Sequence, residues 1–125
     1  MNKYHFTLSI RFKNDYDVKN LQKILKLKPY KVITYSESKG NEKSAKFIYR
    51  TDTLTNIYTD DLFAKFIEQI KPKLDKIKEI LQTNNGVCVL RIVFDELKEK
   101  PCIDLSAQTI ALLNDLSADF EVDFN

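Results

Sequence analysis

The alternation that decides the fold lies near the start of the chain, in the nine residues YHFTLSIRF at positions 4–12. Apolar and polar residues alternate along this stretch. The apolar set is Tyr4, Phe6, Leu8, Ile10 and Phe12, and the polar set is His5, Thr7, Ser9 and Arg11. Successive side chains of a strand point to opposite faces of a sheet. Period two therefore predicts a strand with one buried face and one polar face.

Further strands follow along the chain. Segments rich in β-branched and aromatic residues predict strands at 31–35, 45–51, 87–94 and 102–105, and the alternation at 120–124 predicts a last one. The polar residues 36–44 connect the strands predicted at 31–35 and 45–51, so we expect a hairpin with a long, mobile tip. The stretch 87–94 is apolar except for Arg91, which is typical of a central strand covered on both faces.

Three segments have apolar residues at helical spacing. The first is capped by Asp15 or Asp17, which can accept hydrogen bonds from free N–H groups, and it ends before Lys28–Pro29. The last is capped by Ser106 and extends toward Leu116.

The longest helical segment starts at Thr59 or Asp60 and extends to Leu81. Pro72 falls inside it, so either the helix kinks there or Pro72 opens a second helix. The run Asn84-Asn85-Gly86 stops the helical pattern, because these residues tolerate a left-handed backbone.

The predicted order is β-α-β-β-α-β-β-α-β, in a single domain of residues 1–125. Mixed strands and helices favour an α+β fold, with helices packed on one face of a mainly antiparallel sheet. The other face is then left open to solvent or to a partner.

The sequence also bears on the family of the protein. Leu25-Lys26-Leu27-Lys28-Pro29 and the loop to Gly40 resemble the "leucine, x, leucine, x, proline … glycine" signal of a bacterial family, the domain of unknown function 4279. The segments LFAKFIEQIKPKLDKIKEIL at 62–81 and LSAQTIALLNDLSADFEVDF at 105–124 resemble its long helical segment and its C-terminal helix and strand. KFIYRTD at 46–52 departs from its Trp-led strand. The resemblance implies a bacterial setting and assigns no site residue.

The composition excludes several kinds of chemistry. The two glycines, Gly40 and Gly86, are too far apart for a phosphate-cradling loop. The single histidine, His5, and the two cysteines give no metal-ligand set and no disulfide framework. We therefore expect no catalytic residue, no cofactor and no metal, although an enzyme with a dispersed site is not excluded. No signal-peptide core or membrane span is visible, which favours the cytoplasm.

Individual side chains have plain structural interpretations. We expect His5 to be an edge or surface residue, Cys88 and Cys102 to be buried packing thiols, and Arg91 to form an ion pair. The acidic pairs Asp60–Asp61 and Asp95–Glu96 have carboxylates that could bind Mg²⁺ or Ca²⁺, but a helix start and a charged turn account for them.

A basic segment supplies the candidate binding surface. Lysines and tyrosines interleave in and around the hairpin: Lys26, Lys28, Tyr30, Lys31, Tyr35, Lys39, Lys43 and Lys46. Basic residues bind phosphates and aromatic rings stack on bases, but dedicated readers of nucleic acid use Arg, and this chain has 17 Lys and 3 Arg. The candidate residues are His5, Arg11, Lys28, Tyr30, Lys31, Tyr35, Lys39 and Arg91.

Charge is segregated along the chain, because basic residues concentrate in the first 50 positions and acidic residues in the last 41. The polar face of the first strand is basic and that of the last strand is acidic. Opposite charges across paired strands are favourable. We therefore expect these two strands to be neighbours, within one chain or across a homodimer.

Our preferred function is a non-catalytic module that binds another protein through the open sheet face or the tip at 36–44. A regulatory or neutralising role, like that of immunity proteins, is an analogy based on size and on the absence of a catalytic set. The alternatives are single-stranded nucleic-acid binding through the Lys/Tyr hairpin, and an enzyme.

Overall fold

The alternating stretch at the start of the chain forms β1 (Lys3–Phe12), a central strand of the sheet. The structure is a computed structural model, and it describes residues 1–55 and 59–125, without the side chains of residues 59–63. Strand β1 pairs antiparallel with β3 (Ala45–Arg50) and with β5 (Gly86–Glu96). Its five apolar side chains are no more than 1% exposed, as the period-two pattern predicts.

The sheet has the strand order β2-β3-β1-β5-β6, and β4 (Leu54–Thr55) pairs with the N-terminal end of β1. Strand β2 (Lys31–Ile33) forms a hairpin with β3. Strand β6 (Asp119–Phe124) runs parallel to β5, after a crossover through α4 (Ala107–Asp115). The other pairings are antiparallel. The predicted α+β class is thus confirmed.

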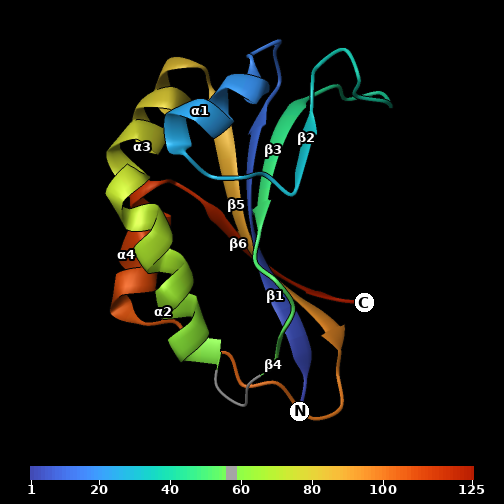
Figure 1. Cartoon of the computed structure of the whole chain (residues 1–125), viewed down its shortest axis with the longest axis vertical. Helices are drawn as coiled ribbons and strands as arrows, with labels where there is room; N and C mark the ends of the chain where they lie inside the picture. The colour runs from blue at the N-terminus through green and yellow to red at the C-terminus, as the bar shows by residue number, and fades with distance from the viewer. Residues whose placement is uncertain (56–58) are drawn as a thin grey trace.

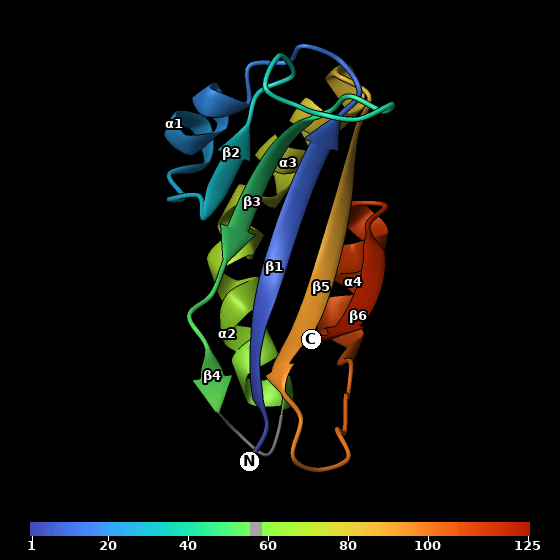
Figure 2. The same cartoon turned by 90° about the vertical axis from the view of Figure 1, so that its right-hand side faces the viewer.

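All helices of the described residues lie on one side of the sheet (Figure 1), and the opposite side is free of helices (Figure 2). They are α1 (Leu21–Leu25), α2 (Thr59–Ile70), α3 (Leu74–Thr83) and α4. Each helix contributes buried apolar side chains to the core beneath it: Leu21 and Leu25, Phe66 and Ile67, Ile77 and Leu81, and Leu112. Burial of one such side chain stabilises the fold by about 1.5–3 kcal/mol.

The long helical segment breaks at Pro72. A 3₁₀ turn (Lys71–Lys73) contains this proline and separates α2 from α3. Both predicted alternatives are therefore partly right, because the axis is interrupted and a new helix follows. Helix α3 ends at Thr83, and Asn85 takes the left-handed conformation (φ 54°) before Gly86 begins β5. The predicted cap at Thr59 or Asp60 lies outside the described side chains.

The first predicted helix is shorter than expected. It consists of a 3₁₀ turn (Val18–Asn20) followed by α1, and neither part has a side-chain cap. The prediction that Asp15 or Asp17 caps it is wrong. Asn14 makes the local turn instead, since its side-chain oxygen accepts a hydrogen bond from the Tyr16 N–H at 3.0 Å. The helix ends where Lys26 adopts a left-handed conformation (φ 53°).

Two predictions about strands are wrong. Residues 102–105 form no strand, although Ser106 caps α4 as predicted, its hydroxyl oxygen accepting a hydrogen bond from the Thr109 N–H at 3.2 Å. Strand β5 is covered by helices on one face only. On its other face Val87 is 45% exposed, and Val93 is buried at 9%.

Within one chain, the predicted pairing of the first and last strands is also wrong. Strand β5 lies between β1 and β6, so their side chains are not directly opposite each other. The long apolar strand takes the place beside β1, because it can cover ten residues of it.

Candidate functional site

The helix-free side of the sheet is the candidate functional surface, and we call it the open face (Figure 2). The core-facing positions of each strand and the strand register determine which residues lie on it. These are Lys31 and Ile33 of β2; Lys46, Ile48 and Arg50 of β3; Lys3, His5, Thr7, Ser9 and Arg11 of β1; Val87, Val89, Arg91 and Val93 of β5; and Asp119, Glu121 and Asp123 of β6.

The half of the open face formed by β1, β2 and β3 is basic, and we call it the basic half. Apart from Lys3 at the start of β1, which pairs with Glu96, it contains four cations: Arg11, Lys31, Lys46 and Arg50. Arg11 lies opposite Lys46, and Lys31 lies opposite Ile48, so the cations surround an apolar side chain. Among the described residues none of the four has a carboxylate within 4.0 Å. Acidic residues line the same hollows as these cations without pairing with them: Glu42 with Arg11 and Lys46, Asp52 with Arg50, and Glu37 with Lys31 and Lys46.

The β6 side of the open face is acidic, and two of its three carboxylates contact Arg91. Arg91 Nε lies 2.9 Å from Glu121 Oε2 and 3.1 Å from Asp123 Oδ2. The predicted ion pair of Arg91 is confirmed. Its partners are on the parallel strand β6, where the register puts Glu121 directly opposite Arg91. This guanidinium is therefore engaged within the sheet.

His5 is buried on a central strand, and the prediction of an edge or surface residue is wrong. It is 6% exposed, and its Nδ1 lies 2.7 Å from Asp95 Oδ2. The contact depends on a bulge, because the β1–β5 register shifts between Lys3 and Tyr4. The extra residue turns both Asp95 and Glu96 toward β1: Asp95 contacts His5, and Glu96 lies 3.4 Å from Lys3.

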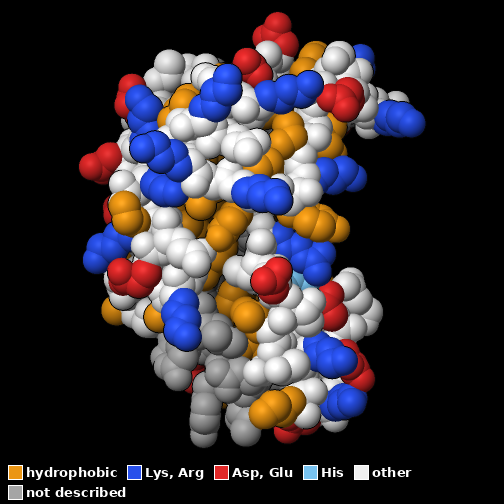
Figure 3. All heavy atoms as spheres, viewed as in Figure 1, with side chains coloured by type: hydrophobic (Ala, Val, Ile, Leu, Met, Phe, Trp, Pro, Cys, Tyr) orange, Lys and Arg blue, Asp and Glu red, His pale blue; other side chains and the backbone are white. Residues whose placement is uncertain are grey.

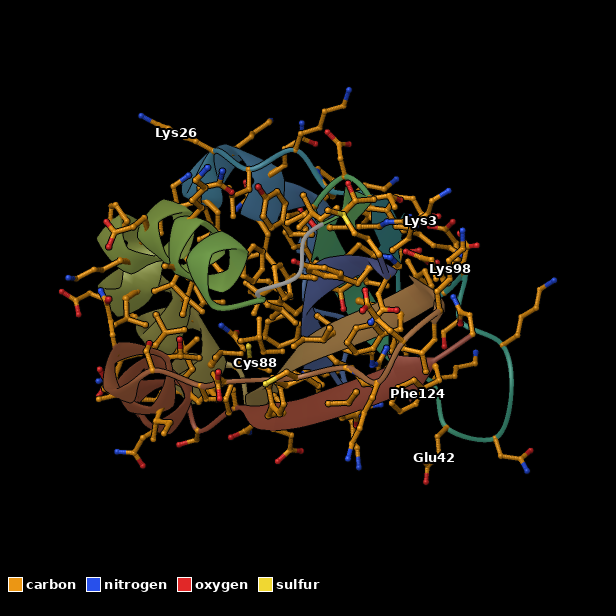
Figure 4. All side chains as sticks on the ribbon, turned by 90° about the horizontal axis from the view of Figure 1, so that it is seen from below. Lys3, Lys26, Glu42, Cys88, Lys98 and Phe124 are labelled. Atoms are coloured by element: carbon orange, nitrogen blue, oxygen red, sulfur yellow. The ribbon has the colours of Figure 1, made fainter. Side chains whose placement is uncertain are left out.

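Glu96 lies between two lysines at one end of the sheet. Its carboxylate contacts Lys98 at 3.2 Å and Lys3 at 3.4 Å, and Figure 4 shows the two lysines beside each other. Hydrogen bonds from Lys98 and then Lys3 lower the pKa of Glu96. The two carboxylates of the acidic pair therefore have separate partners: His5 for Asp95, and the two lysines for Glu96. The second acidic pair, Asp60–Asp61, lies outside the described side chains.

A groove of about 520 Å³ borders the basic half where β2 begins, and we call it the Tyr30 groove. It is lined by Lys28, Pro29, Tyr30, Arg50, Thr51, Asp52 and Thr53. Tyr30 is 63% exposed, and the Arg50 guanidinium lies 4.8 Å from the centre of its ring. Stacking on an aromatic face holds a guanidinium without using its hydrogen-bond donors.

The hairpin tip has a hollow of its own, of about 370 Å³, to which Lys31, Lys39 and Lys46 contribute. Glu37 also lines it, and hydrogen bonds from Thr34 lower the pKa of this carboxyl group. Tyr35 packs against the core, and Lys43 Nζ lies 5.9 Å from its ring centre. Figure 3 shows Lys and Arg side chains spread over the upper half of the molecule, which contains α1 and the hairpin.

The structure brings some of the predicted site residues together and separates others. Lys28 and Tyr30 share the Tyr30 groove, Lys31 and Lys39 share the tip hollow, and Arg11 lies beside Lys46. His5, Tyr35 and Arg91 are engaged in internal contacts. Arg50 is the residue that the sequence reasoning missed. The signal that could have revealed it is the spacing along β3: Lys46, Ile48 and Arg50 occupy every second position and therefore share a face.

The two cysteines differ. Cys88 lies between the sheet and the helices (Figure 4), and burial raises the pKa of its thiol to about 12. Such a thiol is not a nucleophile at neutral pH. Cys102 is exposed, so the prediction that it is buried is wrong.

The described residues contain no group of three or more His, Cys, Asp and Glu side chains arranged to hold a metal ion. None of the helices in the described part of the chain is long and apolar enough to span a membrane.

The mixed sheet, covered by helices on one face and with a basic half on its open face, thus defines an α+β protein. The family model described as "Domain of unknown function (DUF4279)" matches residues 2–125, and the chain belongs to this family. No curated protein and no solved structure matches the chain significantly.

Proposed function

We propose that this protein is a non-catalytic module that binds an acidic surface of a partner protein through its basic half. One observation carries the proposal: Arg11, Lys31, Lys46 and Arg50 lie together on a helix-free face without ion-pair partners among the described residues. Grouped like charges repel one another and attract an opposite surface. Ile48, at the centre of the group, adds apolar contact area.

The aromatic side chains favour a protein over nucleic acid as the partner. Proteins that bind single strands stack bases on exposed rings. The open face carries no aromatic side chain at its described positions, apart from Tyr30 at its border, and Arg50 already covers that ring. Tyr49 points the other way, where it stacks on Phe66 at 5.7 Å between ring centres.

The histidine also supports a role without catalysis. A general base must reach its substrate. His5 is buried and bonded to Asp95, so its ring is held as part of the sheet.

A capture experiment with two charge-reversal variants tests the proposal. Tagged wild-type protein, the variant Arg11→Glu/Lys46→Glu and the control Lys65→Glu/Lys71→Glu are incubated with native lysate. Both variants change the net charge equally, and the control residues are exposed on the helical side. We expect wild type and control to retain the same protein, and the Arg11/Lys46 variant to retain at least tenfold less. Retention should also weaken as salt is added.

Two results would refute the proposal. One is equal retention by all three proteins. The other is a loss of retention after nuclease treatment, together with a gel shift of a single-stranded oligonucleotide in 50 mM salt that the Arg11/Lys46 variant abolishes, which would assign the surface to nucleic acid.

A further inference from the structure

The edge of the sheet is incomplete beside the Tyr30 groove. Strand β2 pairs with β3 only over Lys31–Ile33, opposite Lys46–Ile48, whereas β3 continues to Arg50. The last backbone hydrogen bond between the two segments runs from the Tyr30 N–H to the Ile48 carbonyl, at 2.8 Å. Pro29 comes next and has no N–H to donate. Figure 2 shows β2 beside only the upper part of β3.

The alternation of hydrogen bonds determines where the backbone of Arg50 points. The Thr51 N–H donates to the Phe6 carbonyl of β1 at 3.0 Å. In an antiparallel ladder the neighbouring residue turns its N–H and C=O to the opposite side. The N–H and C=O of Arg50 therefore face outward, where β2 has ended. Neither group has a backbone partner among the described residues.

The side chains beside this edge are suited to a carboxylate. The Arg50 guanidinium is held over the Tyr30 ring, and Lys28 lines the same groove. Neither cation has an ion-pair partner within 4.0 Å among the described residues. Asp52 is the one described acidic residue of the groove lining. A guanidinium can bind a carboxylate through two parallel hydrogen bonds and keep its ring contact.

We infer that the Arg50 edge binds an extended, acidic segment of the partner protein as an added strand. The N–H and C=O of a Glu or Asp in that segment pair with the C=O and N–H of Arg50. Directly paired residues of adjacent strands share a face, so the acidic side chain lies beside the Arg50 guanidinium. The backbone bonds provide affinity and the carboxylate provides selectivity. This inference rests on the proposed function and names the form in which the partner is recognised.

The test uses a defined probe, the capped peptide Val-Glu-Val-Glu-Val-Glu-Val, in three forms. The first is unmodified, the second is N-methylated at all three Glu residues, and the third has Lys in place of every Glu. Hydrogen exchange of the Arg50 amide is followed by NMR. In the free protein this amide should exchange rapidly, because it is unpaired. The unmodified peptide should slow its exchange at least tenfold, and the other two should have no effect.

Two variants of the protein serve as comparisons. Arg50→Gln keeps the backbone and should weaken peptide binding at least tenfold, whereas Lys71→Gln, on the helical side, should leave it unchanged. The inference is overturned if the Arg50 amide stays unprotected at 10 mM peptide, or if the N-methylated peptide binds as well as the unmodified one. If either occurs while capture still depends on Arg11 and Lys46, the proposed function stands and only the added strand fails.

Discussion

The contact between His5 and Asp95 shows how one residue depends on an irregularity far along the chain. In a regular ladder each residue of β1 has one partner on β5. The bulge adds a residue at Asp95, and its carboxylate then reaches His5 across a sequence separation of 90 residues. The Asn125 side-chain amide lies 3.4 Å from the other oxygen of Asp95. The alternation of β1 predicts the face on which His5 lies, but a bulge leaves no comparable pattern in the sequence.

We predict that His5 and Asp95 are energetically coupled. His5→Ala should lower the free energy of unfolding by about 2 kcal/mol, because the half-buried carboxylate of Asp95 loses its hydrogen-bond partner. A double-mutant cycle with Asp95→Ala, measured by denaturant unfolding at pH 7, should give a coupling of about 1–2 kcal/mol. Additive losses would show that the two side chains act independently.

At the scale of elements, the sequence predicts best where periodicity is long. The strands at 3–12, 86–96 and 119–124 and the break at Pro72 follow from apolar spacing and from the chemistry of proline. Strand β4 has only two residues, too few to show a period. At 102–105 the apolar residues suggest a strand, but these residues pair with no other strand among the described residues. Strand pairing depends on the tertiary structure, so the local sequence does not predict it.

The junction of α3 and β5 requires a glycine. A Cβ atom on Gly86 would lie 2.5 Å from Phe12 Cε1 and 2.8 Å from Leu81 Cδ2, both buried side chains. We predict that Gly86→Ala lowers the free energy of unfolding by about 1–3 kcal/mol. Gly40→Ala is the control: it has open space but a positive φ of 103°, which costs about 1 kcal/mol. If thermal unfolding shows a smaller loss at Gly86 than at Gly40, the close packing is refuted.

At the scale of the whole molecule, the segregated charges became two halves of one face. The acidic end of the chain neutralises Arg91 on β5, and the four cations Arg11, Lys31, Lys46 and Arg50 have no ion-pair partner among the described residues. Composition along the chain could predict this imbalance and the candidates Arg11, Lys28, Tyr30 and Lys31. It could not predict that β5 separates β1 from β6, because strand order depends on which strands cover each other best. The role of Arg50 likewise depends on where β2 stops.

Stability of the whole fold should fall in alkali. Burial raises the pKa of Tyr4 and of Cys88 to about 12, from 10.0 and 9.0 respectively. Both groups keep their protons longer in the folded state, so their stabilisation is complete below about pH 9 and is lost as pH rises toward 12. Each group lowers the free energy of unfolding by at most about 1.4 kcal/mol per pH unit over this range.

Urea unfolding between pH 8 and pH 11 measures this slope. Tyr4→Phe should reduce it, and should not lower stability at pH 7, since the Tyr4 hydroxyl has no hydrogen-bond partner among the described residues. An unchanged slope in both Tyr4→Phe and Cys88→Ala would contradict the prediction.

The central position of β1 has a consequence for the synthesis of the protein. This strand leaves the ribosome before the other strands of the sheet, yet its longest pairing is with β5, about 90 residues later. At about 5–20 residues per second, its apolar side chains wait roughly 5–20 s for that partner. The β2–β3 hairpin can form meanwhile, but it covers only one side of β1. Until residue 96 has emerged, one edge of β1 therefore lacks the strand with which it pairs in the folded protein.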